Sequence, residues 1–217
     1  FLSSKAKGKN LWAMSLLGGE AYVVDSFDVS ISQLKRLDAK TLIFKAEEGK
    51  TLYETEIEKK KDNVQVIEDS LHVKPSRLFT FDTDKKKVQR VTDNQFPITS
   101  YAISPDGKWA VTSQTMSPHY GVDGKPSPTH HLWNLTDKTS QQILASGYQT
   151  PGSFQFAADN SGFYFTSVLS SNPEWQGAGI DLLHFYTLST NSVTQVNLGH
   201  DWGLGAGYDV AGSLVIG

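Results

Sequence analysis

The sequence contains no cysteine among its 217 residues. Disulfide bonds, zinc–thiolate sites and cysteine nucleophiles are therefore excluded. An excess of one charge is also lacking, because 20 basic and 23 acidic residues leave a formal net charge of −3. A nucleic-acid-binding surface normally carries a basic stripe, and a membrane span needs a long apolar run. The chain has neither feature, so we expect no nucleic acid and no membrane among its partners.

The first residues do not have the pattern expected of a targeting signal. Phe1 and Leu2 make too short an apolar region for a signal sequence. The last residues, 214–217, have the composition of a strand, so we expect the chain to be cut from a longer protein. The lack of cysteine favours the cytoplasm, while a bacterial periplasmic or secreted location stays open.

Residues 98–113 predict a strand, a tight turn and a second strand. Tyr101 and Ile103 alternate with smaller or polar neighbours, as expected for a strand with one buried face. Asp106 and Gly107 supply the turn, because aspartate caps it and glycine adopts a positive φ without steric cost. We interpret this stretch as the characteristic hairpin of a repeated four-stranded sheet.

Similar turns recur along the chain at intervals of roughly 50 to 70 residues. Each contains an aspartate, and most also contain a glycine: Asp38, Asp106 with Gly107, Asp159 with Gly162, and Asp209 with Gly212. The turn that starts at Asp159 is interpreted as one residue longer than the turn at Asp106. A repeat of four short strands with this period is typical of a β-propeller, whose sheets bury both faces by stacking radially.

We therefore predict an all-β fold: a β-propeller of about four blades, or an arc of a larger propeller, with four antiparallel strands in each blade. The predicted units are 1–29 (partial), 30–97, 98–151, 152–203 and 204–217 (partial). The first partial unit would begin at the third strand of a blade, and the last would end at the second. No apolar periodicity of helical type competes with this interpretation.

Residues 47–75 are the most polar part of the chain, with a run of charges from Glu54 to Asp62. We interpret this part as a long, solvated hairpin at the rim, in which residues 64–67 could form a short strand.

The turn at 104–108, Ser-Pro-Asp-Gly-Lys, resembles the WD40-like (PD40) repeats of TolB and of serine peptidases of the prolyl-oligopeptidase (S9) family. Further segments narrow the resemblance to those peptidases: 10–12 with 18–20, 58–69, and 77–79 with 89–92. Together they resemble the N-terminal propeller of the acylaminoacyl-peptidase and dipeptidyl-aminopeptidase branch.

This resemblance implies a propeller that covers an α/β-hydrolase domain and restricts access to short peptides. The partners that it implies are that hydrolase domain and the peptides, and no cofactor is expected. The chain lacks the Gly-x-Ser-x-Gly turn that exposes a serine nucleophile, so it is expected to be non-catalytic within a hydrolase. An alternative interpretation is a stand-alone TolB-like module that binds another protein.

Four residues on predicted loops are candidates for contact with a substrate or partner: Glu174, Trp175, His119 and Tyr120. An exposed indole beside a carboxylate could hold a peptide's apolar group and its amine, although packing of the indole over a blade edge is an alternative. His130 and His131 are adjacent on a predicted strand and point to opposite faces, so no metal site is expected there.

Overall fold

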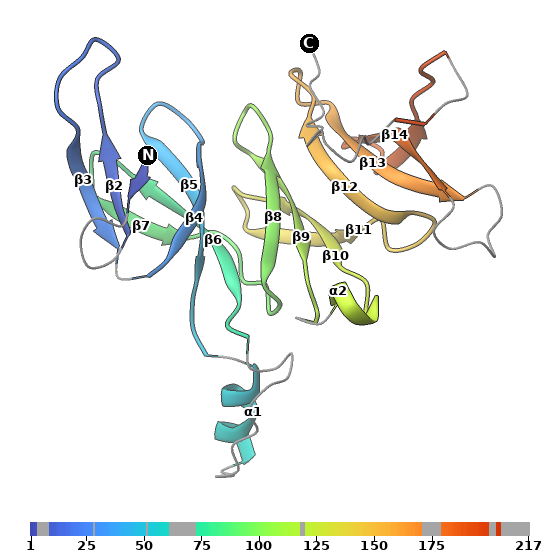
Figure 1. Ribbon diagram of the computed structural model, residues 1–217, viewed down its shortest axis with the longest axis horizontal. Helices are drawn as coiled ribbons and strands as arrows, with labels where there is room; N and C mark the ends of the chain where they lie inside the picture. Colours follow the sequence, from blue (N-terminus) through green and yellow to red (C-terminus); the bar gives the residue numbers. More distant parts are fainter. Residues whose placement is uncertain are drawn as a thin grey trace. The chain divides into compact units, whose positions relative to one another are not determined.

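The computed structural model describes residues 1–3, 9–27, 29–50, 52–60, 73–117, 120–170, 179–199 and 203–204 (Figure 1). The chain divides into two compact units, of which the first comprises Phe1–Ser100 and Ser113–Ser127. The second comprises Tyr101–Thr112 and Pro128–Gly217. The fold is all-β and has the repeated antiparallel sheets of a propeller, and the described residues include two short helices.

Four sheets are present among the described residues, and in each the strands follow one another in chain order. The first has three strands: β1 (Leu2–Ser3), β2 (Lys9–Ala13) and β3 (Tyr22–Phe27). The second has four: β4 (Ile31–Arg36), β5 (Thr41–Glu47), β6 (Ser76–Asp82) and β7 (Lys87–Arg90).

The remaining two sheets also have four strands each. One contains β8 (Ile98–Ile103), β9 (Trp109–Gln114), β10 (Thr129–Asn134) and β11 (Thr139–Ile143). The other contains β12 (Gln149–Phe156), β13 (Gly162–Ser170), β14 (Gly179–Thr187) and β15 (Ser192–Gln195). The prediction of repeated antiparallel sheets is thus confirmed, and the boundaries of the predicted units stay a prediction.

The two hairpins of every four-stranded sheet are tied together by one backbone hydrogen bond. The amide of the residue after the third strand donates to a carbonyl in the turn between the first two strands. The three bonds are Thr83 to Lys40 at 2.9 Å, Leu135 to Lys108 at 2.7 Å, and Leu188 to Ser161 at 3.0 Å. These bonds define equivalent positions in the three sheets, because each marks the same point of the repeat.

Each unit has its own hydrophobic core, made mainly by aromatic and branched side chains of the strands. The core cluster of the first unit comprises Leu11, Phe27, Ile31, Phe44, Ala46, Phe79 and Phe81. The core cluster of the second comprises Ala102, Val111, Leu132, Ile143, Phe156, Phe163, Phe165 and Tyr186. Alternation along the strands places these side chains on buried faces, as the period of two requires.

One segment differs from the predicted long hairpin. Residues Leu52–Lys60 form the helix α1, which Figure 1 shows beyond the ends of β5 and β6. Glu and Lys are good helix formers, and Glu54 in the first turn and Lys59 in the last match the helix dipole. The proposed strand at 64–67 lies outside the described residues.

Two further predictions need correction. The first sheet contains three strands rather than two, because Leu2 and Ser3 pair with Leu11 and Asn10. The turn at Asp159 is not longer than the turn at Asp106, since Asn160 takes the positive φ of 60° that Gly107 takes, at 70°. Gly162 therefore begins β13 instead of forming part of the turn.

Neither helix, α1 nor α2 (Tyr120–Asp123), is long and apolar enough to cross a membrane.

Candidate functional site

Of the four candidate contact residues, only Tyr120 lies within the part of the chain that the structure describes, so the structure does not test whether the four lie together. His119, Glu174 and Trp175 lie outside that part of the chain, as do the turn residues Asp209 and Gly212. Tyr120 begins α2, where its amide bonds to the Ser117 carbonyl at 3.4 Å and its own carbonyl accepts from Gly124 at 2.8 Å. The contact role of these residues stays a prediction.

The aspartates of the repeated turns organise the backbone around them. Asp38 Oδ1 accepts hydrogen bonds from the amides of Lys40 and Thr41, at 2.7 and 2.8 Å. Asp159 Oδ1 accepts from the Ser161 amide at 2.9 Å and from its hydroxyl at 2.7 Å. The amide of Lys40 lowers the pKa of Asp38, and the hydroxyl of Ser161 lowers that of Asp159, because each bond favours the ionised carboxylate.

Asp106 makes the corresponding contacts in the sheet β8–β11. Its Oδ1 accepts from the Ser104 hydroxyl at 2.6 Å and from the Lys108 amide at 3.1 Å. Burial by itself would raise the pKa of Asp106, but the bonds from Ser104 and Lys108 outweigh this effect and the pKa is lowered. These carboxylates are thus used to hold hairpins, a role that keeps them ionised and unsuited to acid catalysis near neutral pH.

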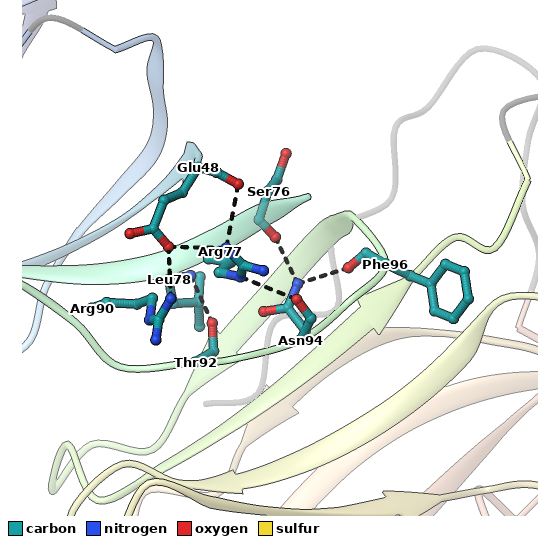
Figure 2. A network of polar contacts seen from close by, with 8 residues as sticks. All are labelled: Glu48, Ser76, Arg77, Leu78, Arg90, Thr92, Asn94 and Phe96. Atoms are coloured by element: carbon teal, nitrogen blue, oxygen red, sulfur yellow. Dashed lines mark hydrogen bonds and ion pairs between the residues drawn. The ribbon is translucent and has the colours of Figure 1, made fainter. Parts of the chain in front are cut away.

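The first unit contains a polar network that the sequence alone does not reveal (Figure 2). Glu48 Oε2 accepts from Arg77 at 3.0 Å and from Arg90 at 3.1 Å, so one carboxylate holds two guanidinium groups. Arg77 also donates from Nε to the Asn94 carbonyl at 3.1 Å. Its side chain is only 16% exposed, and this burial makes the interaction stronger than that of a surface ion pair.

Asn94 extends this network from the other side. Its side-chain amide donates to the carbonyls of Ser76 and Phe96, at 2.9 and 2.7 Å. The Thr92 hydroxyl accepts from the Leu78 amide at 2.9 Å, within the same cluster. The eight residues of the network lie in three separate stretches, at position 48, at 76–78 and at 90–96, so no local sequence pattern signals it. Figure 2 shows them converging on the start of β6 and the link from β7 to β8.

The network lies at the base of the insertion between β5 and β6 that carries α1. The Glu48 amide donates to the Pro75 carbonyl at 3.0 Å, and this bond holds the two ends of the insertion together. Arg77 and Asn94 then join this base to the segment that leads into the next sheet. The arrangement positions backbone segments, and all its charges are already engaged in holding them.

The second unit contains a hollow of about 270 Å³ beside two hairpin ends. Its lining consists of Trp109, Leu132, Asn134, Thr139, Ser140, Gln141, Leu188 and Asn191. Gln141 Nε2 and the Tyr186 hydroxyl both donate to Asn191 Oδ1 at 3.0 Å. The lining side chains are uncharged, so this hollow offers hydrogen bonds but no acid, base or metal ligand. Nowhere in the described part of the chain do three His, Asp or Glu side chains gather as a metal site would need.

Comparison with known proteins identifies the fold. No model of a known protein family and no curated protein matches the chain. Among solved structures, TolB from Acinetobacter baumannii matches with 15% identity and a TM-score of 0.53, over 92% of this chain and 40% of that one. An oligogalacturonate lyase in complex with manganese matches with 14% identity and a TM-score of 0.59, over 87% of this chain and 47% of that one.

A putative TolB from Agrobacterium tumefaciens matches with 10% identity and a TM-score of 0.52, over 88% of this chain and 57% of that one. Similarity at these identities shows the fold alone, and that fold is a TolB-like propeller. The chain spans 40% to 57% of the length of these three proteins.

Proposed function

We propose that this chain is a non-catalytic propeller segment of a serine peptidase of the prolyl-oligopeptidase family. In this role it restricts access to a separate α/β-hydrolase domain, so that only short peptides reach the catalytic serine. The segment itself supplies walls and loops, and the hydrolase domain supplies the nucleophile, base and acid.

One observation carries this proposal beyond the fold. Two of the segments with the peptidase-like sequence, 77–79 and 89–92, lie side by side in the sheet β4–β7, where Phe79 pairs with Arg90. Their side chains also share the network around Glu48, and Thr92 accepts from the Leu78 amide. The two segments therefore form one hairpin and its polar network, so the resemblance extends over one continuous structural element and supports the proposal there.

A stand-alone TolB-like module that binds another protein is the second candidate. The similarity to two TolB structures, with TM-scores of 0.53 and 0.52, favours it as far as the fold can. The two candidates differ in one covalent feature, because only the first requires a hydrolase domain on the same polypeptide.

The experiment begins with the protein translated from the complete reading frame, next to the purified 217-residue chain. Both are assayed on aminoacyl and acyl-aminoacyl nitroanilides, with and without a serine-directed inhibitor. We expect inhibitor-sensitive turnover by the complete protein and none by the chain. Turnover by the chain that the inhibitor abolishes would overturn the non-catalytic assignment.

Access is tested on the complete protein with substrates of different size. We expect cleavage of short peptides and no cleavage of an unfolded protein such as casein, because the propeller would exclude the longer chain. A reading frame that encodes no Gly-x-Ser-x-Gly turn, together with a stoichiometric protein partner in a pulldown, would favour the TolB-like module instead.

A further inference from the structure

The hollow of about 270 Å³ in the second unit has an apolar side and a polar side. Trp109, Leu132 and Leu188 form the apolar side, where Leu132 belongs to the core cluster and the other two pack against it. Gln141 and Asn191 belong to the polar side, and both are exposed. The hollow therefore has the hydrophobic core behind it and opens to solvent between side chains that form hydrogen bonds.

Two hydrogen bonds hold the amide groups of the polar side in place. Gln141 Nε2 donates to Asn191 Oδ1, which also accepts from the Tyr186 hydroxyl. Tyr186 is 4% exposed and belongs to the core cluster, so its hydroxyl ties Asn191 to the interior. Within the described part of the chain, Asn191 Nδ2 and Gln141 Oε1 have no further partner. They offer a donor and an acceptor to a ligand, and a hydroxyl group can serve either of them.

The repeat shows that the backbone does not require an indole beside the hollow. The residue after the tied carbonyl is Thr41 in the sheet β4–β7, Trp109 in β8–β11 and Gly162 in β12–β15. At Gly162 an added Cβ atom would lie 2.0 Å from the Tyr186 carbonyl oxygen, so that place is closed to a side chain. At Thr41 a small side chain suffices. Of the three four-stranded sheets, only β8–β11 has a large aromatic side chain here, and it lines the hollow.

The sheet β8–β11 also lacks charges that the sheet β4–β7 carries at corresponding places. Asp82 pairs with Lys87 at the end of the hairpin β6–β7, and the equivalent pair in the hairpin β10–β11 is Asn134 with Thr139. Asn134 Oδ1 accepts from two amides of its turn, as Asp82 Oδ1 does, so the turn keeps these bonds without a carboxylate. Both uncharged residues line the hollow together with the indole.

We propose that the hollow binds one ring of a neutral saccharide. The apolar face of the sugar ring lies against the Trp109 indole, and its hydroxyl groups bond to Gln141 and Asn191. A hydroxyl group both donates and accepts, so several hydroxyl groups on one ring match a lining that mixes amides and hydroxyls. The proposal does not depend on the peptidase assignment.

The charge and size of the hollow restrict the ligand further. No lining side chain is charged, so an ionic ligand would lose water there without gaining an ion pair. The volume of about 270 Å³ lies just below the range of about 300 to 1,000 Å³ that is typical of sites for drug-sized molecules. It therefore suits a single sugar ring rather than several rings of an oligosaccharide.

Proton–nitrogen correlation NMR spectra of the isotope-labelled chain test this proposal. They contain the indole N–H signals and the side-chain amide signals of asparagine and glutamine. The probes are the methyl glycosides of glucose, galactose, mannose and N-acetylglucosamine, each titrated alone at millimolar concentrations. We expect at least one glycoside to shift the signals of Trp109, Gln141 and Asn191 in a saturable manner. If none of these glycosides does so, the proposal is wrong.

The repeat supplies the first variant, because Trp109→Thr takes the residue of the equivalent position 41. We expect it to weaken binding about tenfold or more, since the sugar ring loses its aromatic contact. Gln141→Ala should weaken binding about fivefold, and because Gln141 is exposed, this variant decides the matter if Trp109→Thr does not fold. Gln142→Ala is the matched control, since neighbouring residues of a strand point to opposite faces. An equal loss of affinity at Gln141 and Gln142 would refute the proposal.

A short neutral peptide is the other ligand that could offer an apolar part with hydrogen-bonding groups. N-acetylglutamine methylamide is therefore titrated in the same way. Saturable shifts of the three side-chain signals with this amide, and with none of the glycosides, would assign the hollow to a peptide and contradict the saccharide proposal. Glycoside binding that Trp109→Thr and Gln141→Ala leave undiminished would place the sugar elsewhere and contradict it as well.

Discussion

The Leu135 amide donates to the Lys108 carbonyl at 2.7 Å and thereby joins two hairpins of one sheet. The turn at 106–108 is consequently held from both sides, by the Asp106 carboxylate and by the following hairpin. The same bond recurs at Thr83 and Leu188, so this pairing of hairpins is a constant of the repeat. It explains why a short polar turn recurs at equivalent places in otherwise different sheets.

The turn carboxylate can be tested in the sheet β8–β11. Asp106→Ala removes the acceptor of the Ser104 hydroxyl and the Lys108 amide, and we expect a loss of about 1 kcal/mol in the free energy of unfolding. Because the pKa of Asp106 is lowered in the fold, its contribution is present above the ordinary pKa of 3.8 and is lost as the pH falls below it. Urea unfolding at pH 7 and pH 3 measures both effects.

Asp84→Ala is the control for this experiment. Asp84 forms an exposed ion pair with Lys40 at 2.5 Å, and because solvent screens such pairs, we expect a smaller loss of stability than at Asp106. A loss at Asp84 as large as the loss at Asp106 would show that the hairpin bonds have no special weight.

Gly162 is the clearest position at which a methyl group should disrupt the fold. A Cβ atom there would lie 2.0 Å from the Tyr186 carbonyl oxygen and 2.7 Å from the Phe185 ring. The backbone of β14 would have to move away, so we expect Gly162→Ala to cost about 3 kcal/mol or more.

Gly152→Ala, in the same sheet, is the matched comparison. The nearest atom to its added Cβ is the Thr150 carbonyl oxygen at 3.9 Å, an ordinary contact distance. We expect a change of less than about 1 kcal/mol for this variant in thermal or urea unfolding. Similar losses at both glycines would contradict the close approach of β13 and β14.

The network around Glu48 predicts unequal roles for its two arginines. Arg77→Met removes bonds to Glu48 and to the Asn94 carbonyl from a side chain that is 16% exposed, and should cost about 2 kcal/mol. Arg90→Met removes one bond from a side chain that is 49% exposed and should cost about 0.5 kcal/mol. Urea unfolding of the two variants gives the comparison, and the reverse order would refute the assigned geometry.

The hydrogen bond of the Trp133 indole predicts that two substitutions of Thr112 differ in their effect on the free energy of unfolding. Its Nε1 donates to the Thr112 hydroxyl at 3.0 Å in a fully buried place. Thr112→Val leaves this donor without an acceptor and should cost about 1 to 3 kcal/mol. Thr112→Ser keeps the hydroxyl and should cost less, mainly through the lost methyl group. Unfolding followed by tryptophan fluorescence measures both variants.

Much of the fold could be predicted from the sequence, because the strands alternate and the turns have distinctive residues. Tyr101 and Ile103 with Asp106 and Gly107 give both signals within a few residues, and β8 and β9 form there as expected. The turn at Asp159 is harder to predict, since an asparagine, Asn160, adopts the positive φ for which glycine is the usual marker. Asparagine tolerates this conformation, so glycine is an incomplete marker of it.

Other features depend on information that no local pattern contains. Helix α1 has charges on most of its faces, and its apolar periodicity is too weak to distinguish it from a solvated hairpin. The network of Glu48, Arg77 and Asn94 joins distant positions, which come together because β5 pairs with β6 and β6 pairs with β7.

The most direct test of the peptidase assignment is labelling of the protein translated from the complete reading frame with a serine-reactive fluorophosphonate probe. Peptide mapping then locates the labelled residue. The account predicts one label, in the part of the polypeptide that follows Gly217, and none within residues 1–217. A label within residues 1–217, or a folded complete protein that takes no label, would contradict it.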